Sequence, residues 1–568
     1  MKKLNGIKEI KGNNSITLIA LLVATLISFY CRIFYGWDQD QSYLTLLAVK
    51  LASGSIMFKD LWDLHQTSMI WGAFLSKVFW AVKGTWDGIG VYLRITSVIV
   101  QVGVALLGYH ELKKYFNRFA AFLAAVILAN MLPRATQNLE YGTISVWLSL
   151  IAALIVVDAT KTQKNELIKV IISACLYAVS IFSYPTMLVS VPVFVWLLLW
   201  DVKDKKTSKL RNLIVFFVTC EAVAAIIVIY LLQFMSFSEL LGTLKAISNS
   251  GDHESLFGSF FKISYWTKSL IRVFGTVAIA LVGWAIAKFA FRKDIKLFYF
   301  YIFAVSLVVL LLNITGIRPS GPFGFLERYI GVAILGAMAG FEVSEKRIIR
   351  LFYWLGVTYY FGSLLGSNLG LNENAMFLEG AVIGAVLAAS EGLSWERGQR
   401  VFEQSAILLF VFSIIFASGY FIRINYTSPA NVLQCSERFT EGPAAGISVM
   451  KEQMDEIAAK VDAVEHISED GKVYALITND SIYNFYLKGT TSAAGYAPTS
   501  NRNYNELWIN YYDEFGHVKP DVILVNTYWY PELEQFYSEI FGQWVKQYYR
   551  YEPIGYEKEF WKLVYVGD

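Results

Sequence analysis

The sequence predicts a multi-pass α-helical membrane protein, with about 13 transmembrane helices and a small C-terminal extracytoplasmic α/β domain. Hydrophobic residues make up 55% of the 568 residues, charged residues only 17%, and the mean hydropathy is +0.45. A soluble chain of this length needs more charge to cover its surface. Long apolar runs recur as far as residue 423 and then stop, and basic residues gather in alternate loops between them.

Each apolar run of sufficient length is interpreted as a membrane span, since about 20 apolar residues cross the hydrocarbon core. The predicted spans are 15–35, 88–110, 117–133, 139–158, 166–183, 185–200, 212–234, 268–290, 296–314, 324–342, 348–366, 376–391 and 402–423. The shorter run 66–82 contains Lys77 and is expected to lie in the membrane interface.

Basic residues predict the orientation, because cytoplasmic loops carry an excess of lysine and arginine. Four lysines precede the first span: Lys2, Lys3, Lys8 and Lys11. Every second loop after it is basic and the loops between are poor in basic residues. We therefore expect a plasma-membrane protein with a cytoplasmic N-terminus and an extracytoplasmic C-terminal domain. No small-residue cleavage site follows the first apolar run, so it is expected to remain as a span.

The chain is divided into a transmembrane domain, residues 1–423 with the first outer loop at 36–87, and an extracytoplasmic α/β domain, residues 424–568. In the second part, runs of buried character predict strands and amphipathic patterns predict helices. The expected strands are 473–477, 522–525 and an edge strand at 560–566, and the expected helical stretches are 446–466, 481–488, 504–515 and 531–548.

Charge and cysteine content exclude several classes of function. The net charge of +3, from 49 basic and 46 acidic residues, leaves no footprint for nucleic acid. Four cysteines in so long a chain make neither a disulfide framework nor a metal cluster. The aromatic content of 16% is typical of membrane proteins, whose tryptophans and tyrosines line both interfaces.

Four carboxylates and a histidine gather in the first outer loop: Asp38, Asp40, Asp60, Asp63 and His65. A carboxylate there can act as a general base on an acceptor hydroxyl or amine. It can also bind a divalent metal, which would hold a phosphate leaving group. An ordinary solvated loop is an equally open interpretation, because outer loops need only lack basic residues.

Two motifs in this loop resemble a known family. Asp40-Gln41-Ser42-Tyr43 resembles an Asp-Glu-x-Tyr motif, and Asp60-Leu61-Trp62-Asp63-Leu64-His65 resembles Asp-x-Trp-Asp-x-His-Pro-Pro. Both are found in the GT-C fold glycosyltransferases that depend on polyprenyl phosphate, among them protein O-mannosyltransferases and lipid A aminoarabinose transferases. The chain departs from the pattern at Gln41, where the family has Glu, and at Gln66-Thr67, where it has Pro-Pro.

The resemblance implies a GT-C-like fold, an extracytoplasmic active site and a polyprenyl-phosphate sugar donor. It makes Asp40 the catalytic base or the residue that orients the acceptor, and Asp38 the source of a second carboxylate. Tyr43, Asp60, Asp63 and His65 become acceptor or loop residues of the site: they are carried over from the motifs. No cofactor is certain, and a divalent metal at Asp38 and Asp40 stays open.

Two further places match the family less specifically. Glu140, at the head of a predicted span, is a candidate partner for Asp40, or an acid favoured by the helix dipole. Arg328 and Tyr329, with Arg318 in the same loop, are candidates for binding the donor phosphate, since arginine offers a planar fork of donors. The alternatives are an arginine that snorkels to the interface or one neutralised by its neighbour Glu327.

Two other polar features lie outside the first outer loop. Asp252-His253-Glu254 lies in a long outer loop and is interpreted as solvated, because adjacent side chains point apart and do not share an ion. Glu221 lies well inside a predicted span, where a carboxylate is a functional candidate or lies at the lipid edge.

The function predicted from the sequence is an inverting hexosyl- or pentosyltransferase of the membrane. It would move a sugar from a polyprenyl-phosphate donor to a cell-envelope glycan, lipid or protein on the outer face, without nucleic acid. A transporter or flippase of lipid-linked sugars is the first alternative, although the two related halves common in transporters are not seen. A non-catalytic envelope assembly protein is the second.

Overall fold

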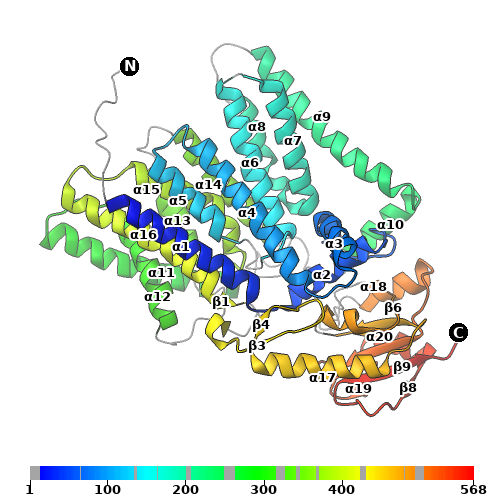
Figure 1. Ribbon diagram of the computed structural model, residues 1–568. Coiled ribbons are helices and arrows are strands. Elements are labelled where there is room, and N and C mark those ends of the chain that lie inside the picture. Colours follow the sequence, from blue (N-terminus) through cyan, green and yellow to red (C-terminus); the bar gives the residue numbers. More distant parts are fainter. Residues whose placement is uncertain are drawn as a thin grey trace.

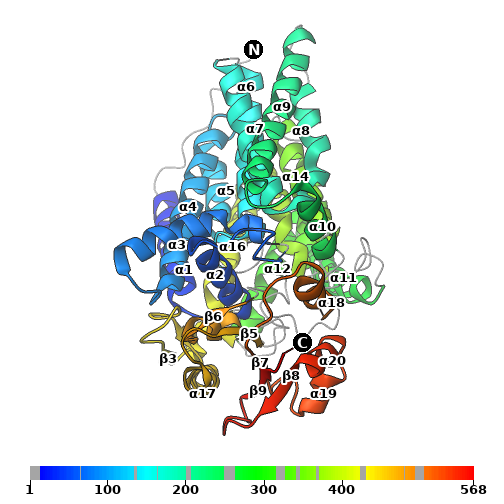
Figure 2. The same cartoon turned by 90° about the vertical axis from the view of Figure 1, so that its right-hand side faces the viewer.

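A computed structural model describes residues 13–567, apart from 64, 133–136, 163, 200–205, 249–262, 315–325, 341–345, 366–369, 372, 423–429, 479 and 493–504. The described chain forms a helical bundle with a smaller sheet-containing domain at one end (Figure 1). In Figure 2 the bundle helices run vertically and this domain lies at their lower end.

Thirteen helices of the described chain correspond to the thirteen predicted spans. They are α1 (Asn13–Phe34), α4 (Ile89–Leu112), α5 (Arg118–Asn130), α6 (Tyr141–Thr162), α7 (Glu166–Ser183), α8 (Val191–Leu199), α9 (Lys206–Leu231), α11 (Ile263–Ala285), α12 (Leu297–Ile314), α13 (Arg328–Gly340), α14 (Lys346–Leu365), α15 (Glu379–Glu391) and α16 (Arg397–Tyr420). Nine of the described helices are long and apolar enough to cross a membrane, and α5, α8, α12 and α13 fall within shorter apolar helices. The predicted multi-pass architecture is confirmed.

The burial of each helix shows where it lies in the bundle. The apolar windows of α6 and α15 are 89% and 94% buried, so these helices form the centre. Those of α9 and α11 are 6% and 17% buried, so these helices lie at the periphery. Small residues allow close crossings: a Cβ added to Gly356 of α14 would lie 2.3 Å from the backbone nitrogen of Ala381 of α15.

At the end of the bundle nearest the C-terminal domain, the predicted outer ends of the helices meet. The Arg32 guanidinium of α1 donates from Nη2 to the Ala129 carbonyl of α5 at 2.9 Å. Ser418 of α16 donates to the Asn130 carbonyl at 2.5 Å. The ends of α1, α5 and α16 therefore lie at one face of the bundle, which we call the loop face.

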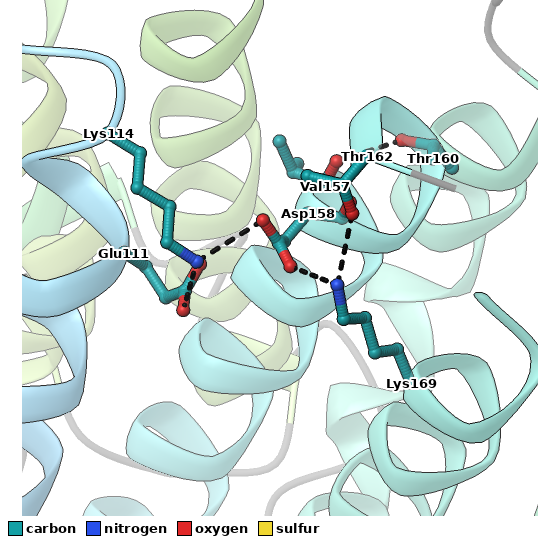
Figure 3. A network of polar contacts seen from close by, with 7 residues as sticks. All are labelled: Glu111, Lys114, Val157, Asp158, Thr160, Thr162 and Lys169. Carbon is teal, nitrogen blue, oxygen red and sulfur yellow. Dashed lines mark hydrogen bonds and ion pairs between the residues drawn. The ribbon is translucent and has the colours of Figure 1, made fainter. Parts of the chain in front are cut away.

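At the opposite end, an ion network joins the predicted inner ends of α4, α6 and α7 (Figure 3). Asp158, 6% exposed, accepts from Lys114 at 3.2 Å and from Lys169 at 2.5 Å. Lys114 also bonds to Glu111 at 2.8 Å. Helix ends thus separate into two sets that match the predicted alternation of loops. Which set faces the cytoplasm stays a prediction.

Two shorter helices lie between the bundle and the C-terminal domain: α2 (Gln39–Ala52) and α3 (Ile70–Lys83), the latter preceded by a 3-10 turn, η1 (Gln66–Met69) (Figure 1). A third, α10 (Phe237–Ser248), follows α9. Trp71, Phe74 and Trp80 of α3 are exposed. An apolar exposed face of this kind is what the predicted interfacial helix requires.

The C-terminal domain contains a five-stranded sheet in the order β6-β5-β7-β9-β8. Its strands are β5 (Val473–Ile477), β6 (Thr490–Thr491), β7 (Val522–Asn526), β8 (Tyr549–Glu552) and β9 (Phe560–Tyr565). The strands β6, β5 and β7 are parallel, whereas β9 is antiparallel to both β7 and β8. The predicted small α/β domain is confirmed.

The helices and turns of this domain are α17 (Lys451–Ile467), η6 (Ser481–Tyr486), α18 (Asn505–Ile509), η8 (Asn510–Glu514), α19 (Leu533–Tyr537) and α20 (Ile540–Tyr548). Two short strand pairs precede them: β1 (Phe421–Ile422) with β2 (Ala430–Asn431), and β3 (Glu437–Arg438) with β4 (Ser448–Val449). A short 3-10 turn, η5 (Val432–Gln434), follows β2.

Three details differ from the sequence-based expectations or fall beyond them. The strand expected at an edge, β9, is internal because β8 pairs with its free side. The expected helix 531–548 is two helices, α19 and α20. Between them the chain turns so tightly that a Cβ on Gly542 would lie 1.8 Å from the Phe536 carbonyl oxygen. The predicted domain boundary at 423/424 lies outside the described residues.

The buried network at Asp158 predicts a measurable loss of stability. Asp158→Asn leaves Lys114 and Lys169 without their shared carboxylate, which we expect to cost about 1–3 kcal/mol. The apparent Tm of the detergent-purified protein should fall by several degrees. Asp455→Asn, at an exposed position of α17, is the matched control and should leave the Tm unchanged. Equal melting of both variants would contradict a role for the network.

Candidate functional site

The first turn of α2 places Asp38 and Asp40 at the loop face. Asp38 is the N-cap residue of α2, and its Oδ1 accepts from the Gln41 backbone nitrogen at 2.6 Å. Aspartate favours this position because its carboxylate pairs with the unsatisfied amides of the helix start. Asp38 is 4% exposed, whereas Asp40 is only partly buried. The partly buried Asp40 is therefore the more accessible of the two carboxylates.

Arg94 of α4 holds the turn that carries these acids. Its Nε donates to Gln41 Oε1 at 3.0 Å, and its Nη1 donates to the carbonyls of Ile33 and Tyr35 at 3.0 and 3.1 Å. Its Nη2 donates to Gln41 Oε1 and to the Gly36 carbonyl. All three guanidinium nitrogens of Arg94 thus donate hydrogen bonds to the end of α1, the turn that follows it or the start of α2.

The second motif of the loop forms a compact polar group with Tyr43 of α2. The Tyr43 hydroxyl donates to Asp63 Oδ1 and lies 3.2 Å from His65 Nδ1. Asp63 Oδ1 also accepts from the His65 backbone nitrogen at 2.7 Å. The His65 ring stacks on Tyr141, the first residue of α6, at 4.0 Å between centroids. The structure therefore brings both motifs together beside the start of α6.

Two of the predicted carboxylates hold local backbone. Asp60 Oδ2 accepts from the Ile56 nitrogen at 2.7 Å and closes its own turn. Glu140 accepts from the nitrogens of Gly142 at 2.8 Å and Thr143 at 2.9 Å. These contacts place Glu140 at the cap of α6, as in the helix-dipole interpretation.

The candidate phosphate-binding arginine belongs to a buried charge cluster between α11 and α13. Arg328 donates from Nε to Thr276 at 3.0 Å and lies 3.6 Å from Glu327 Oε1. Arg272 of α11 bonds to the same Glu327 oxygen at 3.0 Å, and its side chain is 36% exposed. Two guanidinium groups around one carboxylate leave a positive charge, which suits an anionic ligand.

The depth of this cluster differs from the sequence-based expectation of an arginine at interface level. Thr276 lies near the middle of α11, and Tyr329 packs edge-on against Phe410 near the middle of α16, 6.1 Å between centroids. Arg328 therefore lies deeper in the bundle than the helix ends. Arg318 lies outside the described residues.

The C-terminal domain packs on the first loop and closes this region from the loop face. The Trp62 ring contacts Phe515 at 4.6 Å and Tyr511 at 5.3 Å, both edge-on. Gln453 of α17 donates to the Trp37 carbonyl at 2.6 Å, and Trp37 is fully buried. The loop that carries the acids is thus part of an interdomain core.

Asp480 enters the site from the C-terminal domain. It follows β5, at the carboxyl end of the parallel strands, where ligand sites of open α/β sheets gather. Burial, together with the charge of Asp38, raises the pKa of Asp480 to about 6. The Ser42 hydroxyl, the Ile482 nitrogen and Lys460 act in the opposite direction. Asp480 precedes η6, which packs against α2, so it lies near Asp38 at the domain seam.

Asp38 and Asp40 are not joined by a third metal-binding side chain among the described residues. Among the described residues, no group of three or more His, Cys, Asp or Glu side chains is placed to hold a metal ion. The Asp38 carboxylate is directed at the start of its own helix.

Sequence reasoning missed several charged residues inside apolar runs. They are Arg32, Arg94, Arg272 and Glu379, each within a predicted span and flanked on both sides by uncharged residues. Glu379 is fully buried in α15, and among the described residues neither of its carboxylate oxygens has a hydrogen-bond partner. The pattern that could have identified these residues is a charged side chain inside an apolar run, the same pattern that singled out Glu221. Glu221 itself is exposed on peripheral α9, and residues 252–254 lie outside the described chain.

The raised pKa of Asp480 predicts a pH dependence of stability. The folded protein keeps the proton between about pH 4 and pH 6, where the unfolded chain releases it, so stability falls as pH rises through this window. The loss is at most roughly 3 kcal/mol. Asp480→Asn mimics the neutral carboxyl, so its apparent Tm should fall less between pH 4 and 7 and exceed that of the wild type at pH 7.

Asp470→Asn, at an exposed position after α17, controls for the loss of one carboxylate. It should follow the wild-type pH profile. A wild-type Tm that rises or stays level from pH 4 to 6, with an identical profile for Asp480→Asn, would contradict the assigned environment of Asp480.

Several proteins of known structure align with most of this chain at low similarity. The oligosaccharyltransferase of Archaeoglobus fulgidus, solved with zinc and sulfate, aligns over 96% of this chain and 73% of its own, at 13% identity and a TM-score of 0.46. ArnT from Cupriavidus metallidurans in the apo state aligns over 98% and 99%, at 12% identity and a TM-score of 0.39.

The same ArnT bound to undecaprenyl phosphate aligns over 97% of this chain and 98% of its own, at 11% identity and a TM-score of 0.40. No family model matches the chain, and no curated protein matches it. At these identities and TM-scores the likeness is one of outline, and it carries no argument about the site.

Proposed function

We propose that this protein is a membrane glycosyltransferase that moves a sugar from a polyprenyl-phosphate donor to a cell-envelope acceptor. The observation that supports the proposal is the meeting of two separate motifs at one place. Tyr43 of α2, three residues after Asp40, donates to Asp63 and lies beside His65 of the loop. Trp62 of the same loop packs on the C-terminal domain. The resemblance of these motifs to GT-C enzymes gives the site its chemical interpretation.

In the proposed reaction, Asp40 is the general base. The acceptor oxygen or nitrogen attacks the anomeric carbon of the sugar, and its proton passes to the Asp40 carboxylate. The bond between the anomeric carbon and the phosphate oxygen breaks, and its electron pair leaves with the lipid phosphate. Attack from the side opposite the leaving group inverts the anomeric carbon, as expected of an inverting hexosyl- or pentosyltransferase.

The departing phosphate gains negative charge and needs fixed positive charge beside it. Arg272 and Arg328 supply it in this proposal, with Glu327 holding both guanidinium groups in place. Because Arg272 is partly exposed on a peripheral helix, a lipid-borne phosphate can approach it from the side of the bundle. Tyr329, the neighbour of Arg328, is buried and packs edge-on against Phe410, and it stays a candidate for contacting the donor phosphate.

The C-terminal domain, with Asp480 at the seam, is proposed to hold the acceptor. The N-terminus would lie in the cytoplasm and the loop face outside, since the loops of the opposite face carry the basic residues. The acceptor glycan, lipid or protein would then meet the donor at the outer face.

A transporter of lipid-linked sugars is the second candidate, and Glu379 is the observation that favours it. A fully buried intramembrane carboxylate with two unpartnered oxygens is typical of proton and substrate pathways. The first-loop motifs and the closing domain have no role in that function. The two candidates differ in whether the sugar leaves its lipid.

Removing the proposed base tests the transferase directly. Asp40→Asn keeps the shape of the side chain and loses its ability to accept a proton, so transfer should fall by roughly 10²–10⁴-fold. Mass spectrometry of envelope glycans and glycoproteins would show the loss of a terminal sugar in a deletion strain complemented with this variant.

Asp455→Asn is the control for expression and insertion, and it should restore the wild-type glycan profile. Asp40→Glu, which retains a carboxylate on a longer arm, should recover part of the activity. A folded Asp40→Asn variant with full transfer would refute the mechanism.

The proposed phosphate cluster makes a separate prediction about the donor. Arg272→Gln removes one of two positive charges while Glu327 keeps Arg328 as its partner. The KM for the lipid-linked donor should rise about tenfold, with the KM for the acceptor unchanged. Lys268→Gln, an exposed position of the same helix, is the matched control. Unchanged donor kinetics in Arg272→Gln would place the phosphate elsewhere.

A further inference from the structure

A polar pocket lies at the loop face beside the first turn of α2. It covers about 390 Å³, part of which is open solvent, between the ends of α1, α4 and α16. The polar side chains that line it include Arg32, Asp38, Gln41, Arg94, Gln137 and Ser418. None of these was assigned to the proposed donor cluster, which is built by α11 and α13.

The charge of the described pocket lining is positive. Arg32 and Arg94 carry one positive charge each, and Asp38 carries the negative charge. Asp38 Oδ1 accepts from the helix start, and the guanidinium of Arg94 is filled by Gln41 and backbone carbonyls. Arg32 is therefore the cation with donors left over.

Arg32 is buried without a carboxylate partner in the described chain. Its side chain is 7% exposed, and its two hydrogen bonds go to neutral groups, Gln101 Oε1 at 3.3 Å and the Ala129 carbonyl at 2.9 Å. A buried charge that lacks an opposite charge is costly, and a bound anion offsets that cost. An interfacial arginine that snorkels would be exposed to water instead.

Three buried polar atoms of the lining side chains have no hydrogen-bond partner within the part of the chain that the structure describes: Arg32 Nε, Gln41 Nε2 and Gln137 Oε1. Buried polar atoms of this kind call for a ligand or water that pairs with them. Two of the three are N–H donors, and guanidinium and amide N–H groups are the donors that phosphate oxygens accept. The lining is thus matched to an oxyanion.

The helix that carries Arg32 indicates where the anion comes from. Leu22, Leu26 and Tyr30 of α1 are exposed apolar side chains, and the apolar window of this helix is only 28% buried. A hydrocarbon tail can lie along this face, and its headgroup then reaches the last turn of α1 at interface level. Arg32 lies in that last turn.

We propose that this pocket binds the phosphate of a membrane lipid, with Arg32 as the principal anchor. The bound headgroup would lie against Asp38 and the N-terminal turn of α2, next to the proposed base. The site is separate from the Arg272–Arg328 cluster. The binding does not depend on the proposed transfer reaction, and it can be measured without it.

Binding of defined lipids to the full-length, detergent-purified protein tests the proposal by native mass spectrometry. The probes are phosphatidylglycerol, a diacylglycerol with the same tails, and inorganic phosphate. Arg32→Gln should weaken phosphatidylglycerol binding about tenfold or more and leave diacylglycerol binding unchanged. Arg397→Gln, exposed at the opposite end of α16, is the matched control and should bind like the wild type.

A second variant covers the outcome in which Arg32→Gln fails to fold. Gln41→Glu keeps the acceptor for Arg94 and adds a negative charge to the pocket, so it should also lower phosphatidylglycerol binding about tenfold. Equal affinity of the folded Arg32→Gln variant and the wild type would overturn the proposal. Preference for inorganic phosphate over the lipid would overturn the assignment to a lipid headgroup.

Discussion

The arrangement of the site depends on one buried guanidinium. Arg94 fastens the turn between α1 and α2 through Gln41 and three backbone carbonyls, so the start of α2 has one position relative to the bundle. Asp38 and Asp40 lie on that start. A turn in a loop is ordinarily the most mobile part of a membrane protein. Here Arg94 of α4 donates hydrogen bonds to this turn, so Asp38 and Asp40 are held in place relative to α4.

The C-terminal domain adds a second constraint from the other side. Trp37 and Trp62, the aromatic residues that flank the acids, are buried against this domain. The first loop is therefore held between α4 and α17, and its carboxylates lie at a seam between two bodies. A seam of this kind excludes water from part of the site, which strengthens the electrostatic effect of each charge. It also explains how Asp38, far away in the sequence, affects the pKa of Asp480.

The sequence was sufficient for features that depend on local pattern. Apolar runs located all thirteen bundle helices, and the strand Val473–Ile477 was found at the observed bounds. The sequence pattern did not predict which strands pair. The strand β9 was expected at an edge, but β8 pairs with it, and that pairing depends on tertiary contacts. The depth of Arg328 was missed because α13 begins beside the middle of α11. Arg94 and Arg32 each look like one charge in an apolar run, and only the fold shows that Arg94 fastens α2 while Arg32 retains unpaired donors.

The proposed transferase function requires that the sugar leaves its lipid. Full-length protein in proteoliposomes, supplied with a polyprenyl-phosphate-linked labelled sugar and an envelope acceptor fraction, tests this most directly. Free polyprenyl phosphate and acceptor-bound label should appear together in equal amounts. Label that stays on the lipid and only changes leaflet would contradict the account and identify a transporter.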